Sequence, residues 1–165
     1  MTTRTYAGWV EPIAAQYRET RRELVELARA LPADVWSRPS PLPAWTYKDL
    51  LAHIAGDAGK NALRLLRSVA VGRRADQSLF DQMGRDVESR NARDVAERRE
   101  RSVDQLVGEI EADAEEWQVL LARFGEEDRD LRQEGIPWSL GEALSRNPDG
   151  HDREHLEHLR TAVLK

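Results

Sequence analysis

Histidine is the residue type in this sequence best suited to chemistry, and its placement is uneven. Three of the four histidines, His151, His155 and His158, fall within eight residues near the C-terminus, in the stretch NPDGHDREHLEHLR. On an α-helix each residue advances about 100°, so these three side chains share one face. Histidines four residues apart rise from adjacent turns and can bind one metal ion together. Two such ligands need a third from elsewhere in the chain.

His53, in the stretch WTYKDLLAHIAG, is the only other histidine and could supply that third ligand. It borders the apolar stripe of its predicted helix, and the C-terminal histidines border theirs. The C-terminal stripe is expected to comprise Leu156, Leu159 and Val163. If the two helices pack against each other, the imidazoles meet inside the protein, as in the metal sites of helical bundles. A three-histidine set leaves coordination positions open, which is the catalytic rather than the structural pattern.

A simpler explanation of the histidines competes with this one. The stretch HDREHLEHLR is highly charged, as a solvent-exposed helix end would be. Histidine near a helix C-terminus is also favoured by the helix dipole. Spacing alone therefore leaves both a metal site and a surface helix open.

The composition excludes several other kinds of site. Cysteine is absent, so the chain has no disulfide, thiolate ligand or thiol nucleophile, and thiol chemistry would need sulfur from a cosubstrate. The net charge of −5 argues against nucleic-acid binding, which needs a concentrated positive face. There is neither a signal-peptide core nor a run of about 18 apolar residues, so we expect a soluble, cytoplasmic protein without membrane contact.

The elements that must position the histidines are predicted to be helices. Apolar residues recur at three-and-four spacing in four regions, and strand-like alternation is missing. The predicted helical regions are 6–31, 46–67, 91–124 and the region from 139 onward. We expect an all-α fold: one four-helix-bundle domain over 1–165, with long connections between helices 1 and 2 and helices 2 and 3. An all-helical array with different connectivity is the alternative.

Two helix starts carry a recognisable capping signal. Thr46 is followed three residues later by Asp49, and Ser139 is followed three residues later by Glu142. In a capping box of this kind, each side chain hydrogen-bonds the other residue's backbone N–H. The first signal would fix the start of the helix that carries His53.

Pro148 interrupts the last helical region just before His151. Either a short turn precedes a new helix capped by Asn147, or one helix is kinked at the proline. The two alternatives differ in how freely the His151 side chain can be oriented toward a metal.

The stretch PLPAWTYKDLLAHIAG, together with HDREHLEHL, resembles the DinB-like superfamily of four-helix bundles. The branch concerned is typified by mycothiol-dependent maleylpyruvate isomerase, with Trp-Thr/Ser-x-x-Asp-Leu-Leu-x-His-Leu on the second helix and His-x-x-x-His on the fourth. The matching residues are Trp45, Thr46, Asp49, Leu50, Leu51, His53, His151 and His155. The resemblance implies that His53, His151 and His155 ligate a divalent metal. His158 stands where relatives often have Gln, and would support a ligand or be structural.

The same resemblance raises roles for residues beyond the ligands. Asn91 could face the site, although capping its own helix is the favoured role. Trp138 could form a wall of the pocket, although filling the core is favoured. Trp45 is expected to be a hydrophobic staple without a functional role. Asp49 is expected to cap its helix, with a hydrogen bond to a ligand's second nitrogen as the alternative.

The resemblance further implies a metal-dependent enzyme that acts on a small electrophile. Zn²⁺ is the expected ion, with Ni²⁺, Fe²⁺ or Mn²⁺ as alternatives. Its open position would hold a low-molecular-weight thiol, for a thiol-dependent transferase or isomerase, or water, for a hydrolase. The alternative is a non-catalytic bundle that binds a small molecule or toxin, or a stress-response bundle with a structural or vestigial metal site. Dimerisation is common among such bundles, so a homodimer is conceivable. The sequence ends ten residues after His155, so we do not expect the isomerase's C-terminal domain or an activity that needs it.

Overall fold

The computed structural model describes residues 4–78, 81, 85–146 and 149–163, without the side chains of 57–61. Within these ranges the regular elements are helices, apart from two isolated β-bridges that join Pro39 to Thr46 and Arg132 to Ser139. The expectation of an all-α fold is therefore confirmed.

The first long helix, α1, spans Glu11–Ala30. It starts later than predicted because the preceding residues form a turn, in which Val10 N donates to Ala7 O. Its buried face comprises Ile13, Ala14, Tyr17, Thr20, Arg21, Leu24, Val25 and Ala28. Thr20 and Arg21 are polar members of this otherwise mostly apolar face, so α1 carries both core contacts and buried polar contacts.

The helix that carries His53 is short and firmly capped. After the 3-10 helix η1 (Ala33–Ser37), α2 spans Tyr47–Ile54 and begins with the predicted capping box. Thr46 Oγ1 accepts a hydrogen bond from Asp49 N at 3.1 Å, and Asp49 Oδ2 accepts one from Thr46 N at 2.9 Å. The box satisfies backbone donors at a helix start that has only two turns of helix behind it.

The predicted helix over 46–67 is in fact two helices. α2 ends at Ile54, and α3 begins at Asp57 and runs to Gly72. The break lies at Gly56, where a Cβ atom would approach both Asp94 Cβ and His53 O to 3.0 Å. Glycine is needed because the backbone passes so close to α5. Two residues predicted on the inner face, Ala58 and Asn61, lie outside the described side chains.

The predicted helix over 91–124 is also divided. α5 spans Val87–Arg98 and α6 spans Val103–Leu121, and a second capping box at Ser102 begins α6. The N-cap position of α5 is Asp86, so the favoured prediction that Asn91 caps this helix is wrong.

The last helical region consists of α7 (Leu140–Arg146) and α8 (Gly150–Arg160), preceded by the short 3-10 helix η2 (Glu126–Asp128). The predicted start at Ser139 is confirmed by its reciprocal bonds with Glu142. Asn147 and Pro148 lie outside the described residues. Because α8 begins as a new helix after Asp149, His151 stands in its first turn.

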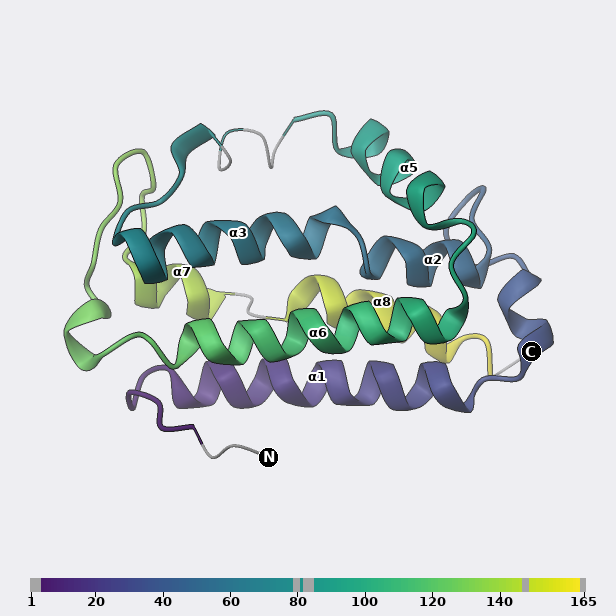
Figure 1. The fold of residues 1–165 in the computed structure, drawn as a ribbon, viewed down its shortest axis with the longest axis horizontal. Coiled ribbons are helices and arrows are strands. Elements are labelled where there is room, and N and C mark those ends of the chain that lie inside the picture. The colour runs from purple at the N-terminus through teal and green to yellow at the C-terminus, as the bar shows by residue number, and fades with distance from the viewer. Residues whose placement is uncertain (1–3, 79–80, 82–84, 147–148, 164–165) are drawn as a thin grey trace.

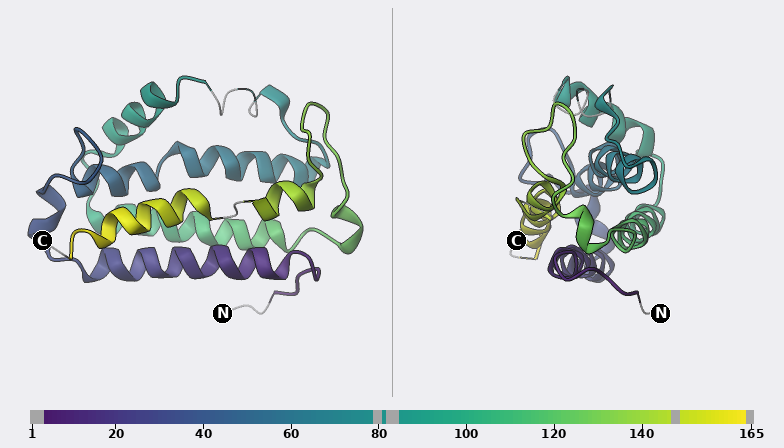
Figure 2. Two further views of the ribbon diagram at one scale, coloured as in Figure 1. Left: turned by 180° about the vertical axis from the view of Figure 1, so that it is seen from behind. Right: turned by 90° about the vertical axis from the view of Figure 1, so that its left-hand side faces the viewer.

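The helices run roughly along one direction, so that distant parts of the chain lie side by side (Figures 1 and 2). α1 packs against α6 and α8, α3 packs against α6, and α2 contacts both α5 and α8. Leu156 and Leu159 are buried as predicted, whereas Val163 is exposed because α8 has already ended at Arg160. Among the described residues no helix is long and apolar enough to cross a membrane.

The capping box of α2 yields a first prediction. Thr46→Ala removes the acceptor for Asp49 N and should lower the free energy of unfolding by about 1 kcal/mol. Urea denaturation followed by circular dichroism measures this change. Thr5→Ala, at an exposed position outside the helices, is the control and should leave the stability unchanged. Equal stability of the two variants would contradict the prediction.

Candidate metal centre

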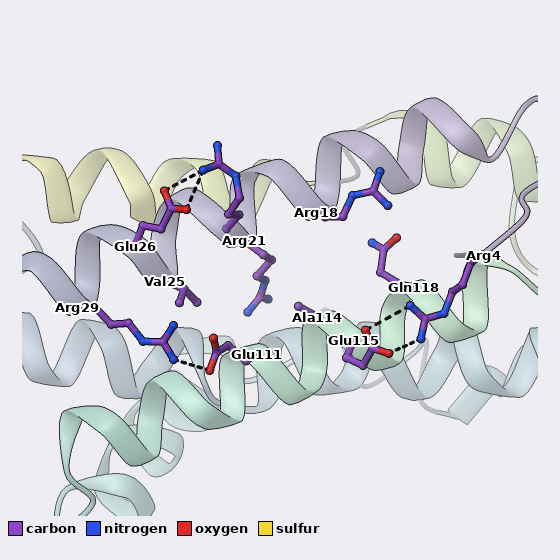
Figure 3. Close-up of a pocket in the computed structure, with 11 residues that line it drawn as sticks. Arg4, Arg18, Arg21, Val25, Glu26, Arg29, Glu111, Ala114, Glu115 and Gln118 are labelled. Carbon is purple, nitrogen blue, oxygen red and sulfur yellow. Dashed lines mark hydrogen bonds and ion pairs between the residues drawn. The ribbon is translucent and has the colours of Figure 1, made fainter. Parts of the chain in front are cut away.

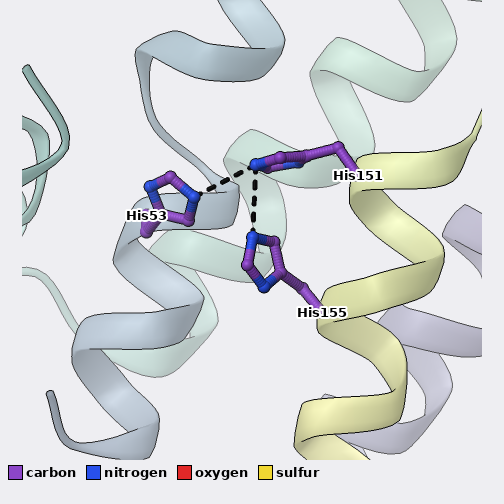
Figure 4. A group of neighbouring side chains, drawn as sticks. All are labelled: His53, His151 and His155. Carbon is purple, nitrogen blue, oxygen red and sulfur yellow. Dashed lines mark hydrogen bonds between the residues drawn. The ribbon is translucent and has the colours of Figure 1, made fainter. Parts of the chain in front are cut away.

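Three histidines from two helices meet in the space between α2 and α8 (Figure 4). His53 lies near the C-terminal end of α2, and His151 and His155 lie one turn apart on α8. His151 Nε2 is 3.0 Å from His53 Nε2 and 3.2 Å from His155 Nε2. The structure thus brings together the three histidines that the sequence singled out as ligands.

The nitrogen positions fit a cation better than a hydrogen-bond network. A neutral imidazole nitrogen carries either one proton or one lone pair, so His151 Nε2 cannot form good hydrogen bonds to both neighbours. A metal ion would accept the lone pairs of all three nitrogens. Zn–N bonds of about 2.0–2.1 Å in tetrahedral geometry place ligand nitrogens about 3.3 Å apart, close to the two distances observed.

Burial keeps two of the three imidazoles neutral. His53 and His155 are 3% and 6% exposed. Burial, reinforced by the proximity of His151, lowers the pKa of His53 to about 4 and that of His155 to about 3. Metal ligation requires deprotonated imidazole, so the protein holds these two ready to bind a metal at neutral pH.

Neighbouring side chains orient the rings. His155 Nδ1 lies 3.3 Å from His158 Nδ1, which assigns His158 a supporting contact behind a candidate ligand. If Nε2 of His155 binds metal, its Nδ1 carries the proton and donates a hydrogen bond to His158 Nδ1. The indole of Trp45 lies 4.9 Å from the His53 ring, centroid to centroid, so Trp45 contacts a candidate ligand, and its role as a hydrophobic staple stays a prediction.

Of the two further candidates, Asn91 has the more suggestive surroundings. It lies on α5, which packs against α2, and its buried Oδ1 has no hydrogen-bond partner among the described residues. Trp138 is exposed, so the favoured prediction that it fills the core is wrong; its ring lies 4.6 Å from the Arg146 guanidinium. None of the contacts described for Trp138 reaches the three histidines, and its role as a pocket wall stays a prediction.

Sequence reasoning missed two charged residues that act on the histidines. The positive charge of Arg90, on α5, contributes to lowering the pKa of His53. Asp152 Oδ1 lies 3.6 Å from His151 Nδ1, and its carboxylate is buried against α1. The sequence offered one signal for Asp152, which is an acidic residue at a helix position that faces the core. A buried carboxylate needs a hydrogen-bonding or charged partner.

The all-helical fold and the three-histidine cluster define a helical protein with a candidate divalent-metal site. The chain matches the family model described as "Mycothiol maleylpyruvate isomerase N-terminal domain" over residues 17–158, and it belongs to that family, a member of the DinB-like superfamily. No curated protein and no solved structure matches the chain.

The lowered pKa values predict acid sensitivity of the metal-free protein. Unfolding exposes His53 and His155, whose pKa values return to about 6.5, so the unfolded state binds more protons below that pH. The free energy of unfolding should therefore fall by at least about 1 kcal/mol from pH 6.5 to 4.5, as urea titrations can measure. A double variant, His53→Gln with His155→Gln, should lose much of this dependence. An equally steep dependence in that variant would contradict the assignment.

Proposed function

We propose that this chain is a metal-dependent enzyme that acts on a small electrophilic molecule, with His53, His151 and His155 as the metal ligands. The observation that carries the proposal is the convergence of three Nε2 atoms from α2 and α8. The proposed scaffold is a single four-helix-bundle domain. Its four arms are α1, α2 with α3, α6, and α7 with α8.

The proposed route for substrate is on the side of His151. Its side chain is 42% exposed, whereas His53 and His155 are buried behind it. A site closed on all sides would favour a structural metal, while one exposed ligand is compatible with exchange of a further ligand. This difference in burial supports a catalytic or ligand-binding role.

Zn²⁺ is the proposed ion because it suits neutral imidazole ligands, and Ni²⁺, Fe²⁺ and Mn²⁺ are the alternatives. When bound, a divalent ion supplies a Lewis acid that lowers the pKa of a thiol or water ligand. The chain supplies three Nε2 lone pairs and holds His53 and His155 neutral. Arg90 and Asn91, on the helix that packs against α2, are proposed to bind polar groups of the substrate.

A low-molecular-weight thiol is the proposed cosubstrate. The description of the matching family names mycothiol, and this chain contains no cysteine that would compete for a metal as thiolate. A transferase or isomerase would use that thiol, whereas a hydrolase would use water at the same position. The two classes share one ligand set and differ in whether the reaction depends on added thiol.

Metal content tests the ligand assignment. Protein purified without an immobilised-metal column should contain or take up about one Zn²⁺ per chain, as measured by elemental analysis. His155→Ala should abolish binding and leave the helical circular dichroism intact, because the site is proposed to be functional rather than structural. Glu154→Gln is the matched control, since it changes an exposed side chain on the same helix and leaves every histidine in place. Wild-type protein that takes up no Zn²⁺, or His155→Ala with unchanged affinity, would overturn the assignment.

Turnover tests the reaction class. Zn²⁺-loaded protein incubated with a low-molecular-weight thiol and a panel of small electrophiles should consume electrophile over many cycles, and His53→Gln should not. Loss of electrophile that does not depend on thiol would indicate a hydrolase. Capture of one electrophile per chain without turnover would favour the non-catalytic binding alternative. No reaction with any electrophile or thiol would contradict the enzyme proposal.

A further inference from the structure

His151 is the least constrained of the three candidate ligands, so its ring must be oriented by contacts other than core packing. It lies in the first turn of α8, directly after the break that follows α7. Its side chain is partly exposed, so core packing alone does not fix the ring. Its Nε2 nevertheless lies between those of His53 and His155.

Two buried aspartates at the start of α8 bind side chains of α1. Asp149 accepts hydrogen bonds from Gln16 Nε2 at 2.6 Å and from Thr20 Oγ1 at 2.5 Å. One turn further along, Asp152 Oδ2 accepts a hydrogen bond from Arg21 Nε at 2.6 Å, and both side chains are almost fully buried. The two aspartates precede and follow His151 in sequence, so α1 fixes the backbone on both sides of it.

We infer that Arg21 and Asp152 are positioning residues for the metal centre, acting through His151. Asp152 uses its two oxygens differently: Oδ2 binds Arg21, whereas Oδ1 faces His151 Nδ1 at 3.6 Å. That distance is too long for a hydrogen bond. It is short enough for electrostatic attraction between the carboxylate and a proton on Nδ1. The carboxylate therefore favours the tautomer with the proton on Nδ1, which leaves the Nε2 lone pair free for a metal. This inference rests on the proposed metal-binding function.

The surroundings of Arg21 support a role beyond fold stability. Arg21 lines a groove of about 770 Å³ between α1 and α6 (Figure 3). Other arginines of this groove pair with surface glutamates, as Arg4 does with Glu115 and Arg29 with Glu111. Arg21 instead bonds Asp152 on α8, in the interior of the protein.

The Arg21–Asp152 pair is also incompletely satisfied. Arg21 Nη1 is buried without a hydrogen-bond partner among the described residues. A buried ion pair with an unmet donor is seldom a net gain in stability over apolar residues of similar size. The pair instead fixes where the Asp152 carboxylate lies, because Oδ2 is held by Arg21 while Oδ1 lies on the side of His151 Nδ1.

The tautomer of His151 in the metal-free protein tests the inference without any variant. Long-range ¹H–¹⁵N correlation spectra of the imidazole at pH 8 should show the proton on Nδ1. A proton on Nε2 in the wild type would overturn the inference, whether or not the protein binds metal. This readout therefore separates failure of the positioning role from failure of the metal proposal.

A double variant, Arg21→Met with Asp152→Leu, tests the consequence for metal binding. Removing both charges leaves no buried charge without its partner, so the helical circular dichroism of the double variant should match that of the wild type. Zn²⁺ affinity, measured by competition with a chelator, should fall about 10- to 100-fold, and His151 should shift toward the Nε2–H tautomer. A folded double variant with wild-type affinity and tautomer would show that the pair is only structural.

Asp128→Asn provides the matched control. It alters another buried aspartate that pairs with an arginine, Arg73, but none of the described contacts of Asp128 reaches a histidine. We expect lower stability with Zn²⁺ affinity within about twofold of the wild type. An equal loss of affinity in Asp128→Asn and in the double variant would mean that lost stability, and not the loss of Asp152, weakens binding.

Discussion

The arrangement depends on one constraint: three imidazole nitrogens must stay within 4.8 Å of one another in a largely buried space. Two of these imidazoles are too buried to take up a second proton and become charged at neutral pH, and the central Nε2 can satisfy only one neighbour by hydrogen bonding. A divalent cation removes this conflict. The helices around the site hold the nitrogens in place.

Both ligand-bearing helices are interrupted next to the site. α2 ends one residue after His53, and Gly56 then lets the backbone pass close to α5. α8 begins one residue before His151. Short helices with fixed ends can be set at the angle that the ligands need, whereas one long helix would place them only by its overall packing. The capping box at Thr46 and the aspartates that bind α1 supply those fixed ends.

The sequence predicted the candidate site better than the detailed fold. Helical periodicity shows that His53, His151 and His155 border apolar stripes, but only the resemblance to the DinB-like superfamily selects these three as ligands and sets His158 apart. The starts at Thr46 and Ser139 were found because capping is local in sequence. The breaks at Gly56 and Ser102 were missed because apolar spacing continues across them, and only contact with a neighbouring helix requires the break at Gly56.

The pairing of Arg21 with Asp152 was beyond sequence reasoning for a related reason. Both residues lie on inner faces of their helices, and Thr20 already interrupted the apolar stripe of α1. Periodicity shows that a polar residue faces inward but not which residue of another helix it meets. The wrong prediction that Asn91 caps a helix has the opposite cause, because residue type indicates a capping tendency but does not place the helix start at Val87.

X-ray absorption at the Zn K-edge of protein loaded with one equivalent of Zn²⁺ tests the central claim most directly. The convergence of three Nε2 atoms predicts three imidazole nitrogens at about 2.0–2.1 Å, with at least one further light ligand. His53→Gln should reduce the imidazole count to two. Fewer than three imidazoles in the wild type, or the same spectrum in both proteins, would contradict the account.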